Sequence, residues 1–170
     1  SWTLREVGTG KVLRVSDKNM RFFPSSDDLL AERMADNGNR QLVRTSIADG
    51  SETVVVPDLP KDDSWEMTPD GKAIILSHEN KGPVEDKDVF QVVEPDDRQP
   101  GWRDRMSLSL LDITTGAVQP LTFGFHNVSL LDISQDSKYV LFSTTSRRLT
   151  ARPTTLFSIW RMNLKTLKAE

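Results

Sequence analysis

The sequence contains no cysteine, and its 170 residues include only two histidines, His78 and His126. The absence of cysteine excludes disulfides, thiolate metal sites and cysteine nucleophiles. Two histidines without cysteine make a poor ligand set for a transition metal, so we expect no metal or other cofactor. We expect structural or surface roles for both histidines; the alternative, a Ser-His-Asp arrangement, has no supporting motif.

An excess of basic charge is also missing. The chain carries 22 Lys and Arg against 25 Asp and Glu, a net charge of -3. Nucleic-acid binding normally requires a basic stripe, so we expect no nucleic-acid partner. No apolar run approaches the roughly 20 residues that span a bilayer, and we therefore expect no membrane span. The length and the 36% hydrophobic content suit a single globular domain.

What the sequence does contain is a repeated signal, a turn followed by a short apolar run. Residues with the preferences of a tight turn precede β-branched, aromatic or leucine-rich segments. The signal occurs three times, in residues 23–31, 68–76 and 134–142. The apolar runs at 73–76 and 139–142 are nearly continuous, which favours strands buried on both faces. Recurrence at about 20–50 residues is typical of repeat architectures.

A second signal, a hairpin with a glycine-containing turn, alternates with the first. The turns are Gly8-Thr9-Gly10, Ala48-Asp49-Gly50 and Thr114-Thr115-Gly116, and strand-like residues flank each of them. Glycine supplies the positive φ that these turns require. A last hairpin begins at Phe157 and turns near Lys165-Thr166. Four strands for each repeat, all antiparallel, are the layout of a propeller blade.

The two signals together predict an all-β fold, a partial β-propeller of antiparallel four-stranded blades. We expect about three blades plus a hairpin within a single segment, residues 1–170. The predicted parts are a hairpin at 1–17 and blade units at about 20–57, 64–122 and 128–170. Intact propellers have about four to eight blades, so we expect this chain to be part of a larger ring. The open strand edges of an incomplete ring also suggest a possible homo-oligomer.

A polar insertion at residues 78–105 interrupts the second unit and is the best candidate for a binding site. Arginine offers bidentate donors for a carboxylate, and tryptophan offers a stacking surface. The candidate binding residues are Arg98, Trp102, Arg103 and Arg105. In the alternative, which we favour, Asp96, Asp97 and Asp104 pair with these arginines and fix the loop. We find no catalytic residues: no Gly-x-Ser-x-Gly nucleophile elbow is present.

The repeats resemble the propellers of the TolB-like and prolyl oligopeptidase groups. The resemblance lies in 68–72 with 111–122, and in 136–143 with 159–164. The insertion, above all residues 95–105, is similar to the N-terminal region of bacterial dipeptidyl peptidase IV-like (S9) serine peptidases. The Glu-Glu pair that captures the peptide amine in true dipeptidyl peptidases has no counterpart here.

The resemblance implies a non-catalytic propeller segment of a serine peptidase. Such a propeller caps a separate α/β-hydrolase domain and gates access of the peptide substrate, so both are expected partners. The chain alone is expected not to be an enzyme, and the resemblance implies a periplasmic or exported protein. A TolB-like binding or scaffolding propeller without a peptidase partner is the alternative.

Overall fold

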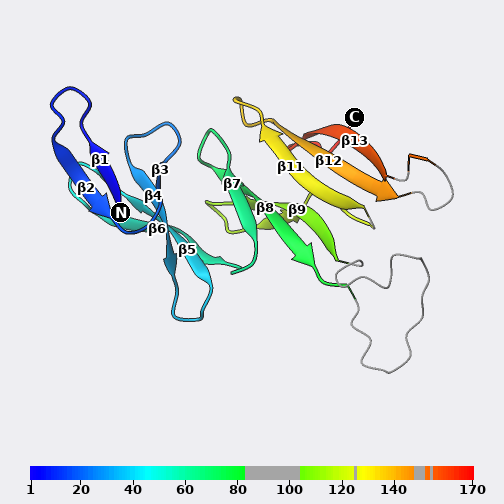
Figure 1. Cartoon of the computed structure of the whole chain (residues 1–170), viewed down its shortest axis with the longest axis horizontal. Coiled ribbons are helices and arrows are strands. Elements are labelled where there is room, and N and C mark those ends of the chain that lie inside the picture. Colours follow the sequence, from blue (N-terminus) through cyan, green and yellow to red (C-terminus); the bar gives the residue numbers. More distant parts are fainter. Residues whose placement is uncertain (83–103, 125, 148–151, 154) are drawn as a thin grey trace.

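The computed structural model of the chain describes residues 1–82, 104–124, 126–147, 152–153 and 155–170 (Figure 1). The described residues form strands, turns and loops and no helix. It follows that no described helix could cross a membrane. The strands are β1 (Trp2–Arg5), β2 (Val12–Ser16), β3 (Met20–Phe22), β4 (Leu29–Met34), β5 (Arg40–Thr45), β6 (Glu52–Leu59), β7 (Ser64–Met67), β8 (Ala73–Asn80), β9 (Arg105–Asp112), β10 (Val118–Pro120), β11 (Asn127–Ile133), β12 (Tyr139–Arg147) and β13 (Thr155–Asn163).

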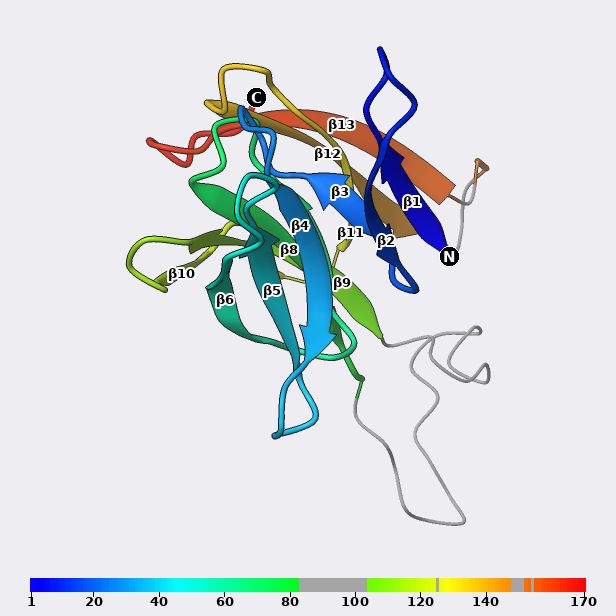
Figure 2. The same cartoon turned by 90° about the vertical axis from the view of Figure 1, so that its left-hand side faces the viewer.

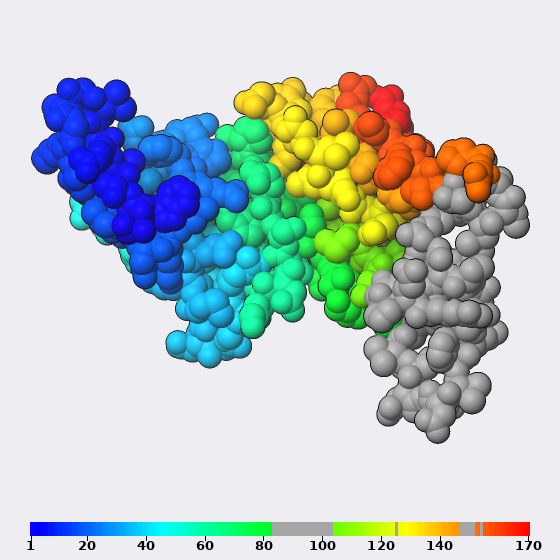
Figure 3. Space-filling view, in the orientation of Figure 1, coloured from blue at the N-terminus to red at the C-terminus, as the bar shows by residue number. Residues whose placement is uncertain are grey.

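These strands form four antiparallel sheets. The β1–β2 hairpin precedes a first blade with the order β3-β4-β5-β6, a second with the order β10-β9-β8-β7, and a third with the order β11-β12-β13. The sheets lie side by side in a row, and Figure 2 shows successive blades one behind another. The two ends of the row lie far apart (Figure 3). The predicted fold class, a partial β-propeller of about three blades plus a hairpin, is therefore confirmed.

Apolar side chains fill the two gaps between successive blades. The first gap holds Phe23, Leu30, Leu42, Val56, Leu59, Met67, Ile74, Leu76 and Leu111. The second gap holds Ile75, Leu108, Leu121, Val128, Ile133, Val140, Phe142 and Met162. Strand β8 contributes alternate residues to both gaps because successive side chains on a strand point to opposite faces. Its predicted burial on both faces is confirmed.

The run at 139–142 is buried on one face only, contrary to the prediction. Val140 and Phe142 are buried in the second gap. Tyr139 and Leu141, on the other face of β12, remain partly exposed. The third blade is the last sheet of the row, and no other described sheet covers this face. A continuous apolar run therefore does not by itself show that both faces of a strand are covered.

The repeated turns contact one another across the row. The Ser25 hydroxyl donates to the carbonyl of Pro69 at 3.4 Å, and the backbone N–H of Asp70 donates to the Ser137 hydroxyl at 3.0 Å. Gly71 lies against the Phe23 ring, where a Cβ atom would be only 2.8 Å from Cε1. The turn signal found in the sequence therefore also supplies contacts between blades, which hold the three sheets in order.

Candidate functional site

Most of the predicted binding residues, namely Arg98, Trp102 and Arg103, lie outside the described residues, as does the predicted short strand at 90–93. Arg105 is the first residue of β9. Its Nη1 donates to the backbone oxygen of Asp104 at 2.9 Å, and its own carbonyl accepts from the Asn80 amide at 3.3 Å. The joint binding site in the insertion therefore stays a prediction.

The described ends of the insertion are held together by Asp104. Its carboxylate accepts from the backbone N–H of Gly82 at 2.7 Å and lies 3.5 Å from the Lys81 ammonium. The Gly82 hydrogen bond, aided by Lys81, lowers the pKa of Asp104 despite partial desolvation. Lys81 also pairs with Glu79 at 2.6 Å, and that hydrogen bond raises the pKa of Lys81. Asp104 thus joins the described ends of the insertion through Gly82 and Lys81. The expected pairing of acidic side chains with the arginines of the loop stays a prediction.

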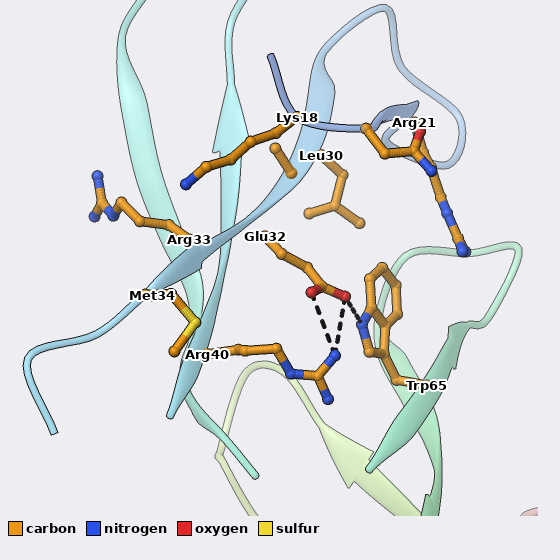
Figure 4. A pocket seen from close by; sticks show the side chains of 10 residues that line it. Lys18, Arg21, Leu30, Glu32, Arg33, Met34, Arg40 and Trp65 are labelled. Atoms are coloured by element: carbon orange, nitrogen blue, oxygen red, sulfur yellow. Dashed lines mark hydrogen bonds and ion pairs between the residues drawn. The ribbon is translucent and has the colours of Figure 1, made fainter. Parts of the chain in front are cut away.

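A polar network in the first gap is the best-defined site in the described part of the chain (Figure 4). Both carboxylate oxygens of Glu32, on β4, accept from Nη1 of Arg40, on β5, at 3.2 Å. Glu32 also accepts from the indole N–H of Trp65, on β7, at 2.7 Å. Glu32 therefore links the first blade to the second through one charged and one neutral donor.

Arg40 extends this network to the connection between the blades. Its Nη2 donates to the carbonyl of Pro60 at 2.9 Å and also to that of Asp63. The Arg40 side chain is only 16% exposed, and its Nε is buried without a hydrogen-bond partner among the described residues. The guanidinium therefore depends on Glu32 for its charge compensation.

His78 joins the same region from β8. Its Nδ1 lies 2.5 Å from the carboxylate of Asp63, which is only 6% exposed. Because a buried carboxylate is unfavourable without a polar partner, the half-exposed imidazole of His78 stabilises Asp63 in its buried position. His126, by contrast, lies exposed in the connection before β11.

A cavity of about 430 Å³ opens beside Glu32 and Trp65. Its described lining residues are Lys18, Asn19, Arg21, Leu30, Ala31, Glu32, Arg33, Met34, Arg40 and Trp65. The Arg21 guanidinium lies 5.0 Å from the centre of the Trp65 ring and 3.3 Å from the Glu66 carboxylate. Arg33 pairs with Glu52 at 3.3 Å. The cavity lining therefore combines cationic side chains with the apolar side chains of Leu30 and Ala31.

Trp65 also borders a second cavity, of about 380 Å³, between the second and third blades. Its lining includes Ser77, Met106 and Leu130. The described residues contain no group of three or more His, Asp or Glu side chains that could hold a metal ion.

Sequence reasoning did not find the network. Met34 pairs with Arg40 and Glu32 with Leu42, so Glu32 and Arg40 lie on the same face, diagonally across the β4–β5 hairpin. Alternation along the two arms of that hairpin could have placed this pair together. No local signal places Trp65 beside them, because that contact depends on how two blades stack.

The architecture defines the class of protein to which the chain belongs, the β-propellers. No family model and no curated protein matches the sequence. Among solved structures, TolB from Acinetobacter baumannii matches 99% of the chain with a TM-score of 0.51 and 19% identity. An acylaminoacyl peptidase of Pyrococcus horikoshii matches 99% with a TM-score of 0.62 and 14% identity.

A second acylaminoacyl peptidase structure, in complex with Z-Gly-Gly-Phe-chloromethyl ketone, matches 99% of the chain with a TM-score of 0.64 and 14% identity. At these identities the comparisons show the fold alone. The chain spans 36% of the length of the TolB structure. It spans 27% of each acylaminoacyl peptidase. The matched part of each neighbour is thus a minority of a longer protein.

Proposed function

We propose that the chain is a non-catalytic propeller segment of an S9-type serine peptidase of the dipeptidyl peptidase IV-like kind. The observation that carries this proposal is the fit of the three blades to acylaminoacyl peptidases, with TM-scores of 0.64 and 0.62, against 0.51 for TolB. The likeness of the insertion to the N-terminal region of bacterial dipeptidyl peptidase IV-like (S9) peptidases adds support. In this function the propeller gates the access of peptides and the chain itself forms no covalent intermediate.

The partners that this function requires are an α/β-hydrolase domain of the same parent protein and a peptide substrate. We propose a hairpin at 1–17, blade units at about 20–57, 64–122 and 128–170, and an insertion at 78–105 within the second unit. Export or a periplasmic location follows from the resemblance and is part of the same proposal. The arginines of the insertion and Trp102 are the proposed contacts for the peptide.

A TolB-like propeller that binds another protein is the second candidate. The match to TolB over 99% of the chain favours it. In this case the blades serve as a rigid scaffold for protein recognition, and no hydrolase domain is required.

The experiment that separates the two candidates is labelling of the full-length parent protein with a fluorophosphonate, which reacts with activated serine nucleophiles. We expect one labelled serine, within a Gly-x-Ser-x-Gly elbow encoded beyond Glu170, and loss of labelling when that serine is replaced by alanine. The chain of residues 1–170, incubated alone with the probe and with peptide substrates, serves as the control and should show neither labelling nor hydrolysis. A parent protein without a reactive serine would contradict the peptidase proposal and leave the TolB-like one.

A further inference from the structure

The cavity beside Trp65 has the dimensions and walls of a ligand site. Its volume of about 430 Å³ lies within the usual range for small-ligand pockets. Leu30 forms a buried apolar base, and Met34 is 56% exposed. The indole of Trp65 lies on the second blade, opposite β4 (Figure 4). An apolar group can therefore be enclosed between side chains of two different blades.

The charge of the cavity favours an anion. Glu32 is the single carboxylate among the described lining residues, and Arg40 and Trp65 already donate to it. Its negative charge is therefore compensated within the protein. Three other cations line the cavity, namely Lys18, Arg21 and Arg33.

Two of these cations retain donors for a ligand. The Lys18 ammonium forms no ion pair with any described residue. Arg21 uses only Nη1 in its pair with Glu66, and both side chains of that pair are about half exposed. Exposed pairs of this kind contribute little energy and exchange readily with other partners. In Figure 4 the charged ends of Lys18 and Arg21 point away from each other on opposite sides of Leu30, and the Arg21 guanidinium lies beside the Trp65 ring. Arg21 is therefore the cation next to the apolar wall that Trp65 provides.

An exposed strand edge adjoins the same cavity. Strand β3 is the edge strand of the first blade, and it contributes Arg21 to the cavity lining. An edge strand presents backbone N–H and C=O groups to which an extended peptide can pair. No described strand pairs with the outer edge of β3. The cavity and the edge together suit a peptide better than an isolated small anion.

We propose that this cavity binds an extended peptide that presents a carboxylate beside an apolar side chain. The carboxylate pairs with the Arg21 guanidinium, the apolar side chain packs on Met34 and Trp65, and the peptide backbone follows β3. The carboxylate can come from the end of a chain or from a glutamate side chain. This inference goes beyond the proposed function, because it applies equally to a peptidase segment and to a TolB-like propeller.

The test uses three dye-labelled pentapeptides and fluorescence anisotropy with the chain of residues 1–170. The first is a polyalanine peptide that ends in leucine with a free carboxylate, the second is its carboxamide, and the third is the carboxamide with glutamate before the leucine. We expect the first or third peptide to bind, the second to bind about tenfold more weakly or not at all, and binding to weaken with added salt. Binding of the first peptide would identify a C-terminal carboxylate as the ligand group, and binding of the third would identify a glutamate side chain. Equal binding of all three, or binding by none, would overturn the proposal.

Substitutions then assign the binding to this cavity. Arg21→Gln should weaken binding of the carboxylate peptide by about tenfold, the loss expected for a charge-assisted hydrogen bond. Lys18→Gln removes a cation that points away from Arg21 and should weaken binding less. Met34→Gln tests the apolar contact and should weaken all leucine peptides. Lys11→Gln removes an exposed lysine on the β1–β2 hairpin and is the matched control, with no expected change. Circular dichroism checks that each variant is folded; unchanged binding by a folded Arg21→Gln variant would refute the site.

Discussion

Leu167 adopts a φ of 57° at the turn position that glycine occupies in the three other hairpins. Its N–H donates to the carbonyl four residues earlier, as do those of Gly10, Gly50 and Gly116. A left-handed backbone conformation is unfavourable for leucine because its Cβ atom crowds the backbone. Glycine has no Cβ and adopts this conformation without that penalty. The last hairpin thus keeps the left-handed turn of the other three, but it has leucine at the position where they have glycine.

We predict that Leu167→Gly stabilises the chain by about 0.5–1 kcal/mol, because it removes this strain from an exposed turn. Urea unfolding followed by circular dichroism measures the change in free energy. Gly116→Ala is the matched reverse control, since no atom lies within 4 Å of the added Cβ and only the φ of 71° is tested. Gly116→Ala should destabilise the chain by about 1 kcal/mol. If Leu167→Gly lowered the stability instead, the contacts of the Leu167 side chain would outweigh the strain of its left-handed backbone.

Between elements, Glu32 connects the first two blades through Arg40 and Trp65. We predict that Glu32→Gln destabilises the chain by about 1–3 kcal/mol, since the mostly buried Arg40 guanidinium then loses its counter-charge. Chemical denaturation followed by tryptophan fluorescence measures the effect.

Glu52→Gln is the matched control for this prediction. Glu52 also accepts from arginines, at 3.5 Å from Arg14 and 3.3 Å from Arg33, but all three side chains are about half exposed. Its loss should change the stability by less than about 0.5 kcal/mol. Similar effects of the two substitutions would mean that the Glu32 network behaves as an ordinary surface pair.

The elements that sequence reasoning predicted are those with local causes. The hairpin turn at Gly50 and the turn at Thr68–Lys72 each require particular residues at fixed positions, so the strands β5, β6 and β8 could be predicted from the sequence. The all-β fold and the order of the blades follow from the recurrence of these signals.

The candidate site was less predictable, because its residues meet only when blades stack. Glu32 and Trp65 are separated by 33 residues, and neither belongs to a motif. Composition alone directed attention to the arginines of the insertion, of which the structure describes only Arg105. The sequence pattern placed Arg105 in the insertion, whereas in the structure it is the first residue of strand β9.

At the scale of the whole molecule, the row of sheets presents an apolar face at the end occupied by the third blade. Phe157 and Ile159 are 72% and 66% exposed on β13, and the register places them on the face opposite Met162 and Val140. The partly exposed Leu141 belongs to the same face. Arg161, Ser143 and Thr145 share this face, which is therefore apolar only at Leu141, Phe157 and Ile159. Exposed apolar side chains on a sheet are often covered by another sheet.

We predict that the chain of residues 1–170 associates with itself through this face at concentrations of roughly 100 μM. The double variant Phe157→Thr and Ile159→Thr keeps strand-forming residues while it removes apolar surface, so it should sediment as a monomer with unchanged circular dichroism. Phe123→Ser is the control, because Phe123 is equally exposed but lies in a connection outside the sheets. Sedimentation velocity distinguishes the outcomes: a monomeric parent chain, or equal effects of the control and the double variant, would contradict association through β13. Association lost only in the double variant would identify this face as the surface that requires another sheet, as expected for one part of a larger ring.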